Sequence, residues 1–449
     1  MLFRSRSIPA DKIALVQLAD APWLDMDVMS WSRHFRCFPG QGDFPLTDFM
    51  DAVSATGYGG LLSLEIFNDQ FRAGSPRGVA VDGQRSLVYL MDQMRGHPGA
   101  LAKAAPQIPP RAQCLGIEFL EFAADDRPAA ALANLFSGLG FRKVGEHKSK
   151  AVTRWSQGAI NLVLNSDKDG FAHSHQLSHG PSVCAMCLKV DDATATLDRA
   201  EKLRDTPFRQ AVGPGELEIP AVRGLGGSLL YFVDPKSELG RLWDIDFTAP
   251  KRPQGNGSAG LTAIDHVSQS MHYEEMLSWL LFYNSLLDVT KTPQLDVIDP
   301  GGIVRSQVVQ STDGALRIAL NASQSQQTLS SRFLTHYLGS GVQHIAFATG
   351  DIVATVKQLR ANGVELLSMP ENYYDDLEAR TDLSAGRIDA LRENNILYDR
   401  DEAGEYLQAY TKSFEDLFFF EIVERRAYKG FGAVNASIRL AAQARESGS

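Results

Sequence analysis

The chain has 449 residues, of which 44% are hydrophobic and 22% are charged, and its formal net charge is −10. This length exceeds what one core can cover and predicts roughly three domains of ~150 residues each. The acidic balance, without a basic stripe, argues against a nucleic-acid partner. Because no apolar run reaches the ~18 residues of a membrane span, and the first residues lack the apolar segment of a signal peptide, we expect a cytoplasmic protein.

The first 105 residues alternate between two kinds of pattern. Residues 12–19 and 60–69 are near-continuous apolar runs, which are typical of strands covered on both faces in a parallel sheet. Residues 45–56 and 86–94 have apolar residues at helical spacing. This βαβα order predicts a parallel α/β segment over residues 1–105.

Three stretches of this segment, Gln17–Pro22, Arg36–Phe44 and Gly57–Asp69, resemble the last two strand–loop units of the xylose-isomerase-like barrel. In particular, they are similar to bacterial 3-dehydroshikimate dehydratases fused to a dioxygenase-like C-terminal half. In that family four oxygen donors from four strands hold a divalent metal such as Mg, Mn or Co. The resemblance implies that Gln17 and Glu65 are the two later donors, and that the two earlier carboxylates come from strands absent here.

A complete barrel of this type needs ~250 residues. The resemblance therefore implies that the chain starts late and that its barrel metal site is incomplete. Arg33, His34 and Arg36 are candidates for holding an acidic substrate, because a guanidinium pairs bidentately with a carboxylate. The alternative is that Glu65 is an ordinary residue at the rim of the strand.

After a linker at residues 107–111, the chain carries an internal repeat. The matching pairs of segments are 116–122 with 263–269, 135–141 with 281–287, 182–193 with 341–352, and 228–234 with 417–423. Each copy predicts a pair of βαβββ units. We therefore predict a first module at residues 106–250, a linker at 251–260, a second module at 261–440 and a tail at 441–449.

The two copies differ at three positions that we expect to be buried in strands. The first copy has the apolar residues Phe119, Ala185 and Phe232, and the second has His266, His344 and Glu421. A lone histidine on an apolar strand is usually a packed core residue, but three buried polar groups would each cost ~1–3 kcal/mol if unpaired. One shared cation explains all three, and two histidines with one carboxylate suit non-haem Fe(II).

Four motifs of the second half resemble the 4-hydroxyphenylpyruvate dioxygenase type of the vicinal-oxygen-chelate superfamily: Ile264–Val267, Gly341–Phe347, Met369–Leu377 and Phe418–Ala433. The resemblance runs from near Gln113 onward. It implies that His266, His344 and Glu421 bind Fe(II), while the 2-oxo acid of the substrate chelates the metal and supplies the electrons. It also places Ser306, Asn321 and Gln408 in the substrate pocket.

The chain departs from this family at four positions. Val434 replaces a glycine, Ala436 replaces an aromatic residue that closes over the substrate, and Phe333 and Thr335 stand where glutamines are usual. A pocket without hydrogen bonds to a substrate hydroxyl discriminates poorly for it. A different 2-oxo acid, or a metal-binding scaffold without turnover, fits equally well.

Three functions therefore stay open. One is a lyase that forms protocatechuate from 3-dehydroshikimate by metal-assisted loss of water. Another is an iron dioxygenase acting on an aromatic 2-oxo acid, and the third is a structural or oligomerising partner for the barrel. Each has a small acidic molecule or a second copy of the chain as its partner, and none involves nucleic acid or a membrane.

Two further clusters, one of cysteines and one of histidines, are not expected to form functional sites. Cys184 and Cys187 form a CxxC inside an apolar strand pattern, with no second CxxC for zinc, so we expect reduced core thiols. The histidines of residues 173–179 have no carboxylate or cysteine at ligand spacing, so we expect a solvated loop there.

Overall fold

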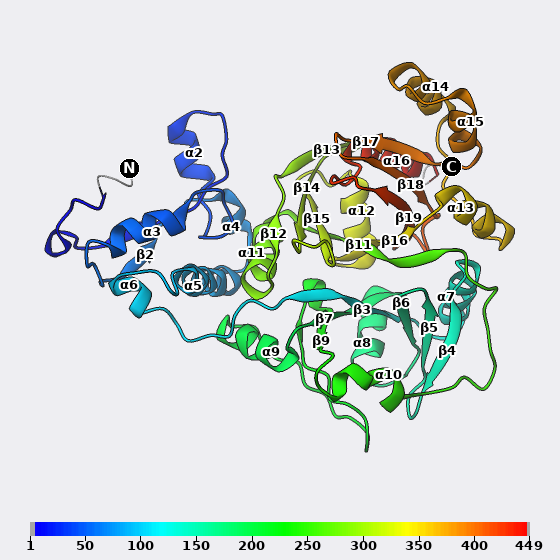
Figure 1. The fold of residues 1–449 in the computed structure, drawn as a ribbon, viewed down its shortest axis with the longest axis horizontal. Coiled ribbons are helices and arrows are strands. Elements are labelled where there is room, and N and C mark those ends of the chain that lie inside the picture. The colour runs from blue at the N-terminus through cyan, green and yellow to red at the C-terminus, as the bar shows by residue number, and fades with distance from the viewer. Residues whose placement is uncertain (1–4, 447–449) are drawn as a thin grey trace. The chain divides into compact units, whose positions relative to one another are not determined.

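A computed structural model describes residues 5–446 and divides the chain into two compact units (Figure 1). Unit 1 runs up to Gln113 and includes the segments Asp192–Pro207 and Tyr273–Thr290. Unit 2 comprises Cys114–Asp191, Phe208–His272 and the chain from Lys291 onward. Among residues 5–446, no helix combines the length and the apolar character needed to cross a membrane.

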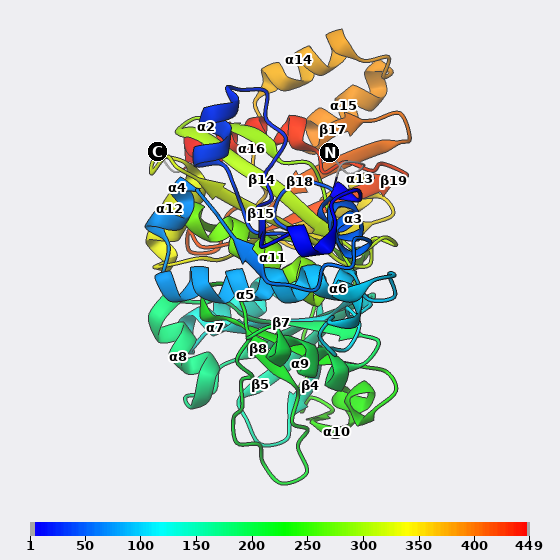
Figure 2. The ribbon, with the colours of Figure 1, turned by 90° about the vertical axis from the view of Figure 1, so that its left-hand side faces the viewer.

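Unit 1 is built on two short parallel strands, β1 (Val16–Leu18) and β2 (Leu62–Leu64). They occupy the centres of the two apolar runs found in the sequence. The helices around them, of which α5 is seen lengthwise in Figure 2, are η1 (Ala10–Lys12), α2 (Val28–His34), α3 (Leu46–Ser54), α4 (Asp69–Ala73), α5 (Pro76–Gln93), α6 (Ala100–Lys103), α9 (Ala193–Lys202), η4 (Tyr273–Glu275) and α11 (Met276–Leu286).

The local sequence explains the main helices of unit 1. Met50 and Val53 of α3 are buried against both strands of the pair, together with Leu90 of α5. Helix α5 begins where the Ser75 hydroxyl accepts a hydrogen bond from the Gly78 N–H, with proline at the first helical position. The α/β character predicted for residues 1–105 is thus present as a parallel strand pair covered by helices.

A buried arginine fixes the later helices of unit 1. Arg199 of α9 is fully buried, donates to the Ser285 carbonyl at 2.7 Å and forms an ion pair with Asp92 of α5 at 2.9 Å. A buried charge is tolerated only when it is paired and hydrogen-bonded. These contacts therefore tie α9 and the end of α11 to α5.

The first half of unit 2 is one sheet with strand order β10-β4-β5-β6-β3-β7-β9-β8. Its strands are β3 (Cys114–Ala123), β4 (Arg142–His147), β5 (Val152–Gln157), β6 (Ile160–Asn165), β7 (Ser182–Val190), β8 (Ala221–Arg223), β9 (Leu229–Val233) and β10 (Phe247–Thr248). Its helices are α7 (Asp126–Gly138), α8 (Gly170–His179), η2 (Leu225–Gly227), η3 (Glu238–Arg241) and α10 (Leu242–Ile245).

The second half of unit 2 repeats this plan with strand order β12-β14-β15-β11-β16-β19-β18-β17 and β13 beside β14. Its strands are β11 (Leu261–His272), β12 (Thr290–Lys291), β13 (Leu295–Asp299), β14 (Gly302–Gln310), β15 (Arg317–Ser323), β16 (Gly341–Thr349), β17 (Leu397–Arg400), β18 (Glu405–Tyr410) and β19 (Phe419–Arg426). Its helices are α12 (Leu329–Tyr337), α13 (Ile352–Ala361), α14 (Glu371–Arg380), α15 (Ala385–Glu393) and α16 (Ala433–Glu446).

The last helix, α16, extends beyond the point where the sequence predicted a tail. It continues to Glu446, so residues 441–446 are helical. The rest of the predicted tail, residues 447–449, lies outside the described residues.

The internal repeat is reproduced in the strand register. In the first copy Phe119 lies opposite Cys187, and in the second His266 lies opposite Ala346. The irregularities along β3 and β11 also fall at matching places, including the one just before Phe119 and the one just before His266. The match between Phe119 and His266 expected from the sequence is therefore confirmed by the pairing of the strands.

The register corrects the third matched position. Glu421 lies opposite Ala346 in the second copy, and the residue opposite Cys187 in the first copy is Tyr231 rather than Phe232. Side chains alternate between the two faces of a strand, so a shift by one residue moves a side chain to the other face. Phe232 therefore faces away from the position that corresponds to the carboxylate.

An aromatic cluster fills the space between the two sheets of unit 2. Phe347 of β16 stacks on Phe420 of β19 with ring centroids 5.2 Å apart, and Phe141 contacts Phe347 at 5.5 Å. Phe122 of β3 contacts Phe420 at 6.3 Å. All four rings are fully buried. The strands that carry His344 and Glu421 are therefore held on their other face by close packing.

The cysteine prediction is confirmed, whereas the histidine-loop prediction is wrong. Cys184 and Cys187 are buried free thiols on β7. Residues 173–179 lie in helix α8, where His175 is buried with its Nε2 3.0 Å from the Tyr337 hydroxyl. The segment forms a helix because its buried side, with Ala172 and His175, meets the sheet.

Burial of His175 predicts a pH-dependent stability. Burial, reinforced by the charges of His179 and Arg223, lowers the pKa of His175 to about 3. The unfolded chain, with an ordinary pKa near 6.5, then binds more protons than the folded chain as the pH falls below that value, so acid destabilises the fold. Between pH 7 and pH 5 the wild type should lose about 2 kcal/mol more unfolding free energy than His175→Gln.

Denaturant unfolding at the two pH values measures this difference. His336→Gln is the matched control, because His336 is exposed on α12. Equal pH dependence of the wild type and His175→Gln would contradict the prediction.

Candidate metal centre

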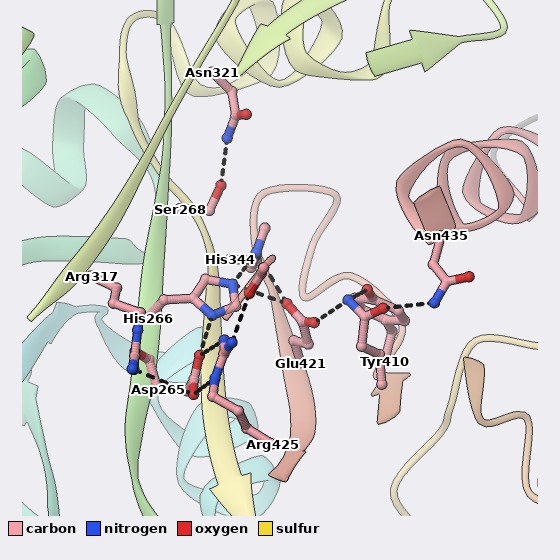
Figure 3. Close-up of polar contacts among 12 residues, drawn as sticks. Asp265, His266, Ser268, Arg317, Asn321, His344, Tyr410, Glu421, Arg425 and Asn435 are labelled. Atoms are coloured by element: carbon pink, nitrogen blue, oxygen red, sulfur yellow. Dashed lines mark hydrogen bonds and ion pairs between the residues drawn. The ribbon is translucent and has the colours of Figure 1, made fainter. Parts of the chain in front are cut away.

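The three polar residues of the second copy meet on one face of its sheet. His266 lies on β11, His344 on β16 and Glu421 on β19, and these strands are neighbours (Figure 3). Their ligand atoms all lie within 4.8 Å of one another. Glu421 is 2% exposed and His266 6% exposed, so the group sits inside the protein.

The geometry of the three donor atoms is close to an equilateral triangle. His266 Nε2 lies 3.3 Å from His344 Nε2 and 3.2 Å from Glu421 Oε2, and His344 Nε2 lies 3.3 Å from Glu421 Oε2. Two ligands about 2.1 Å from one ion are about 3.0 Å apart at a right angle and about 4.2 Å apart on opposite sides. Neighbouring ligands of a tetrahedral ion are about 3.4 Å apart at the same bond length. The three donors therefore fit adjacent positions on one ion of either geometry, which leaves its opposite side open.

Asp265 orients the first histidine. Its Oδ1 lies 2.9 Å from His266 Nδ1, and Arg425 donates to both carboxylate oxygens at 2.9 and 3.0 Å. Burial acts to raise the pKa of Asp265, but the hydrogen bonds from His266 and Arg425 hold that pKa well below its usual range. A carboxylate only accepts hydrogen bonds, so Nδ1 carries a proton, and Nε2 is the atom that would present its lone pair to an ion once it has lost its own proton.

The charges of the centre favour a cation. Burial lowers the pKa of His344 to about 4, so this ring is a neutral donor near pH 7. Burial acts to lower the pKa of His266 as well, but Glu421 and Asp265 raise that pKa to about 9. The two histidines likewise hold the pKa of Glu421 well below its usual range against the effect of burial. The field that draws a proton to His266 would also draw a metal ion there.

A chain of hydrogen bonds joins Glu421 to the C-terminal helix. Gln408 of β18 donates from Nε2 to Glu421 Oε1 and to the Tyr410 hydroxyl, each at 2.9 Å. Asn435 of α16 donates to Gln408 Oε1 at 3.0 Å. Gln408, which the sequence assigned to the substrate, thus holds the carboxylate in place and connects it to α16.

A cavity of about 380 Å³ opens over the three donors. Ser306 and Asn321 line it beside Gln408, and Ser306 lies opposite Asn321 in the register of β14 and β15. Asn321 Nδ2 donates to Ser268 Oγ at 2.8 Å. The volume lies in the range of small-molecule sites.

The positions that depart from the dioxygenase family fall in different places. Ala436 and Val434 of α16 line the cavity, so these two substitutions do alter its wall. Phe333 is buried and Thr335 is exposed on α12, and the cavity-lining residue of this helix is Ser330. Of the four departures from the dioxygenase family, the two on α16 are therefore the ones that change the wall of the cavity.

The candidate residues of the barrel segment lie in unit 1. Gln17 lies opposite Ser63, and Glu65 follows two residues later, so both side chains point to the same face of the strand pair. Arg36 Nη1 forms an ion pair with Glu65 Oε2 at 2.7 Å. Arg33 is exposed, and His34 pairs with Asp69 at 2.8 Å.

Sequence reasoning missed the residues that support the ligands. Asp265 and Arg425 are 160 positions apart, and no local pattern marks their pairing. Asp265 had one signal, since it directly precedes His266 in a strand with an otherwise apolar start. Asn435 and Arg439 belong to a helix of mixed composition and gave no signal.

Known families cover most of the chain. Residues 2–90 match the xylose isomerase-like TIM barrel, and residues 110–248 match the N-terminal domain of hydroxyphenylpyruvate dioxygenase. Residues 263–381 match the glyoxalase, bleomycin resistance protein and dioxygenase superfamily. These families imply a divalent metal site in the second module, where the cluster lies.

Individual proteins match either nearly the whole chain or a large part of it. A 3-dehydroshikimate dehydratase of Pseudomonas aeruginosa is 47% identical over 447 residues, covering 97% of this chain and 70% of that protein. A 4-hydroxyphenylpyruvate dioxygenase of the same organism is 36% identical over 324 residues, covering 71% of this chain and 90% of its own. A solved fusion of a xylose isomerase-like TIM barrel with a 4-hydroxyphenylpyruvate dioxygenase superposes with a TM-score of 0.87 at 46% identity, covering 99% of this chain and 71% of that one.

The similarity thus covers residues of both units. The chain belongs to the 3-dehydroshikimate dehydratase family, in the form that joins a xylose isomerase-like barrel segment to a 4-hydroxyphenylpyruvate dioxygenase-like half.

Proposed function

We propose that the second module is a mononuclear non-haem Fe(II) centre that reacts O₂ with a small 2-oxo acid. The observation that carries this proposal is the facial triangle of His266, His344 and Glu421 beneath a cavity of about 380 Å³. Two imidazoles and one carboxylate with open positions are typical of Fe(II) oxygenases. When bound, Fe(II) supplies the one-electron chemistry that O₂ needs.

The residues around the triangle have separate tasks in this proposal. Asp265 keeps the His266 lone pair aimed at the ion, and Gln408 holds the Glu421 carboxylate. Asn321 and Ser306 offer polar groups to a bound acid on the cavity wall. Because Ala436 leaves space at this wall, we expect 4-hydroxyphenylpyruvate itself to be a poor substrate.

Anaerobic titration with Fe(II), followed by O₂ uptake with a panel of 2-oxo acids, tests the proposal. We expect one iron per chain and uptake that depends on both iron and an acid. Glu421→Gln keeps the shape of the side chain but removes its charge, so it should weaken iron binding and abolish uptake. Iron binding without uptake for any acid would favour the alternative of a metal-bearing scaffold.

The barrel segment supports a second candidate function, the dehydration of 3-dehydroshikimate to protocatechuate. Relatives that are 47% identical carry the name 3-dehydroshikimate dehydratase. In this proposal the segment corresponds to the last two strand units of the barrel, Gln17 and Glu65 are two of the metal donors, and Arg36 holds the substrate carboxylate.

An assay of 3-dehydroshikimate with added Mg, Mn or Co tests this candidate. We expect turnover that depends on the added metal, and Glu65→Gln should abolish it because the change removes a charged donor. Turnover that survives Glu65→Gln would exclude a role for this residue.

Several expectations from the sequence stay proposals. They are the boundaries at 1–105, 106–250, 251–260 and 261–440, the cytoplasmic location and assembly as a homo-oligomer. Limited proteolysis and sedimentation of the purified chain would test the boundaries and the assembly.

A further inference from the structure

A cationic side chain faces the metal cavity from the C-terminal helix. Arg439 of α16 lines the cavity, and its guanidinium carbon lies 5.4 Å from the Phe419 ring centroid and 5.6 Å from that of Tyr410. The Phe419 ring in turn stacks on His344 at 5.0 Å. The Phe419 ring therefore contacts both the Arg439 guanidinium and His344, a predicted metal ligand.

The hydrogen bonding of Arg439 leaves most of its donors available. Among the residues that the structure describes, its side-chain hydrogen bond is to Gln443 Oε1 at 2.6 Å, one turn further along the same helix. A guanidinium has five N–H donors in a planar fork that matches a carboxylate. This hydrogen bond stays within α16, so the contacts of Arg439 with other elements are those with the Phe419 and Tyr410 rings, and these leave its remaining N–H donors available.

The net charge of the cavity favours a ligand with more than one negative group. A divalent ion with Glu421 and two neutral imidazoles has a charge of about +1, and Arg439 and the exposed Lys429 add two more positive charges. Asp399 also lines the cavity, where it accepts a hydrogen bond from the Tyr428 hydroxyl. The balance remains positive, so an anionic chelator with a second anionic group is complementary.

We infer that the second module binds an acid that carries two vicinal oxygen donors for the metal and a separate carboxylate for Arg439. This inference rests on the proposed metal site and names the substrate class of that site. A catechol carboxylate and a 2-oxo dicarboxylate share this chemistry. Arg439 is then the residue that sets specificity for the second anionic group.

The dehydration proposed for the barrel segment would supply a ligand of this class. Loss of one water from 3-dehydroshikimate, with transfer of ring protons to oxygen, gives 3,4-dihydroxybenzoate. This product has two vicinal hydroxyls and one carboxylate. The two halves of the chain could then act on successive compounds of one reaction sequence.

Matched pairs of ligands test the inference on the Co(II)-loaded full chain without O₂. The first pair is 3,4-dihydroxybenzoate and catechol, and the second is 2-oxoglutarate and 2-oxobutanoate, and within each pair only the first has the extra carboxylate. Calorimetry gives the dissociation constants, and the visible absorption of cobalt reports whether each ligand joins the metal. In the wild type we expect the extra carboxylate to tighten binding about 10- to 100-fold in at least one pair.

Arg439→Gln should remove that preference while leaving catechol and 2-oxobutanoate binding unchanged, and Arg439→Lys should keep part of it. Unchanged binding of the shorter ligands also shows that the variant is folded. Arg445→Gln is the control for a general charge effect and should change the preference by less than about threefold, because Arg445 is exposed on α16 and is not among the residues that line the cavity. The pair that loses its preference tells which source of vicinal oxygens the site uses.

Two other results would overturn the inference in different ways. If cobalt binds but Arg439→Gln weakens both members of a pair equally, or neither, the assignment of Arg439 is wrong and the metal site stands. If the chain takes up no cobalt, the proposed function fails and the chelate site fails with it.

Discussion

Replacing His344 with alanine is expected to abolish specific binding of a divalent metal by this chain. His344 supplies one corner of the donor triangle, 3.3 Å from each of the other two donor atoms, and the alanine leaves only His266 and Glu421. Two donors hold an ion far less tightly than three on one face, so we expect the dissociation constant to rise at least about 1000-fold, or about 4 kcal/mol.

Thermal unfolding with and without metal measures the loss. A metal at 100 times its dissociation constant stabilises the folded wild type by about 2.7 kcal/mol, and His344→Ala should show no such shift. His336→Ala is the control, since it removes an exposed imidazole from the neighbouring helix α12. A metal-induced shift retained in His344→Ala but lost in His336→Ala would place the site elsewhere.

The three donor residues could be proposed from the sequence because the internal repeat provides a second copy with which to compare them. Ala185, fully buried in the first copy, shows what packing alone requires at the position of His344. The carboxylate position was harder to match, because every residue of β9 is buried. An unbroken apolar run does not reveal which side chains share a face, so Phe232 and Tyr231 could not be distinguished from the sequence.

The supporting residues could not be predicted because they depend on tertiary structure. The pairing of Asp265 with Arg425 exists only once β11 and β19 have both joined β16. Helix α8 was missed for a related reason. A histidine is treated as polar when a sequence is searched for the apolar spacing of a helix. The His175 ring is nevertheless buried against Tyr337, with one hydrogen bond, so it packs as an apolar side chain would.

The Asp265–Arg425 pair should contribute to both stability and metal affinity, and the two effects can be separated. Asp265→Ala leaves the mostly buried Arg425 guanidinium without its bidentate partner, which should cost about 3 kcal/mol of unfolding free energy. The same change frees the Nδ1 of His266, so metal affinity should also fall about 10- to 100-fold.

The double variant Asp265→Ala with Arg425→Met distinguishes these roles. Removing both charges should recover much of the stability relative to Asp265→Ala alone. It should not recover metal affinity, because His266 still has no carboxylate partner. Arg425 also donates to the carbonyls of Tyr428 and Gly430, so Arg425→Met alone completes the cycle. Recovery of both properties in the double variant would show that Asp265 acts only by neutralising Arg425.

The pH dependence provides an independent check on the same pair. The pKa of Asp265 is held well below its usual range, so its contribution to stability is fully present above the unfolded value near 3.9 and is lost as the pH falls toward the folded pKa. The difference in unfolding free energy between wild type and Asp265→Ala should therefore be nearly constant from about pH 5 to pH 6 and shrink below about pH 4. It should also shrink as the pH rises from about 6.5 to about 9, because Asp265 helps to raise the pKa of His266 to about 9. A difference that already declined from pH 6 down to pH 5 would mean that the ionised carboxylate is not what stabilises this region.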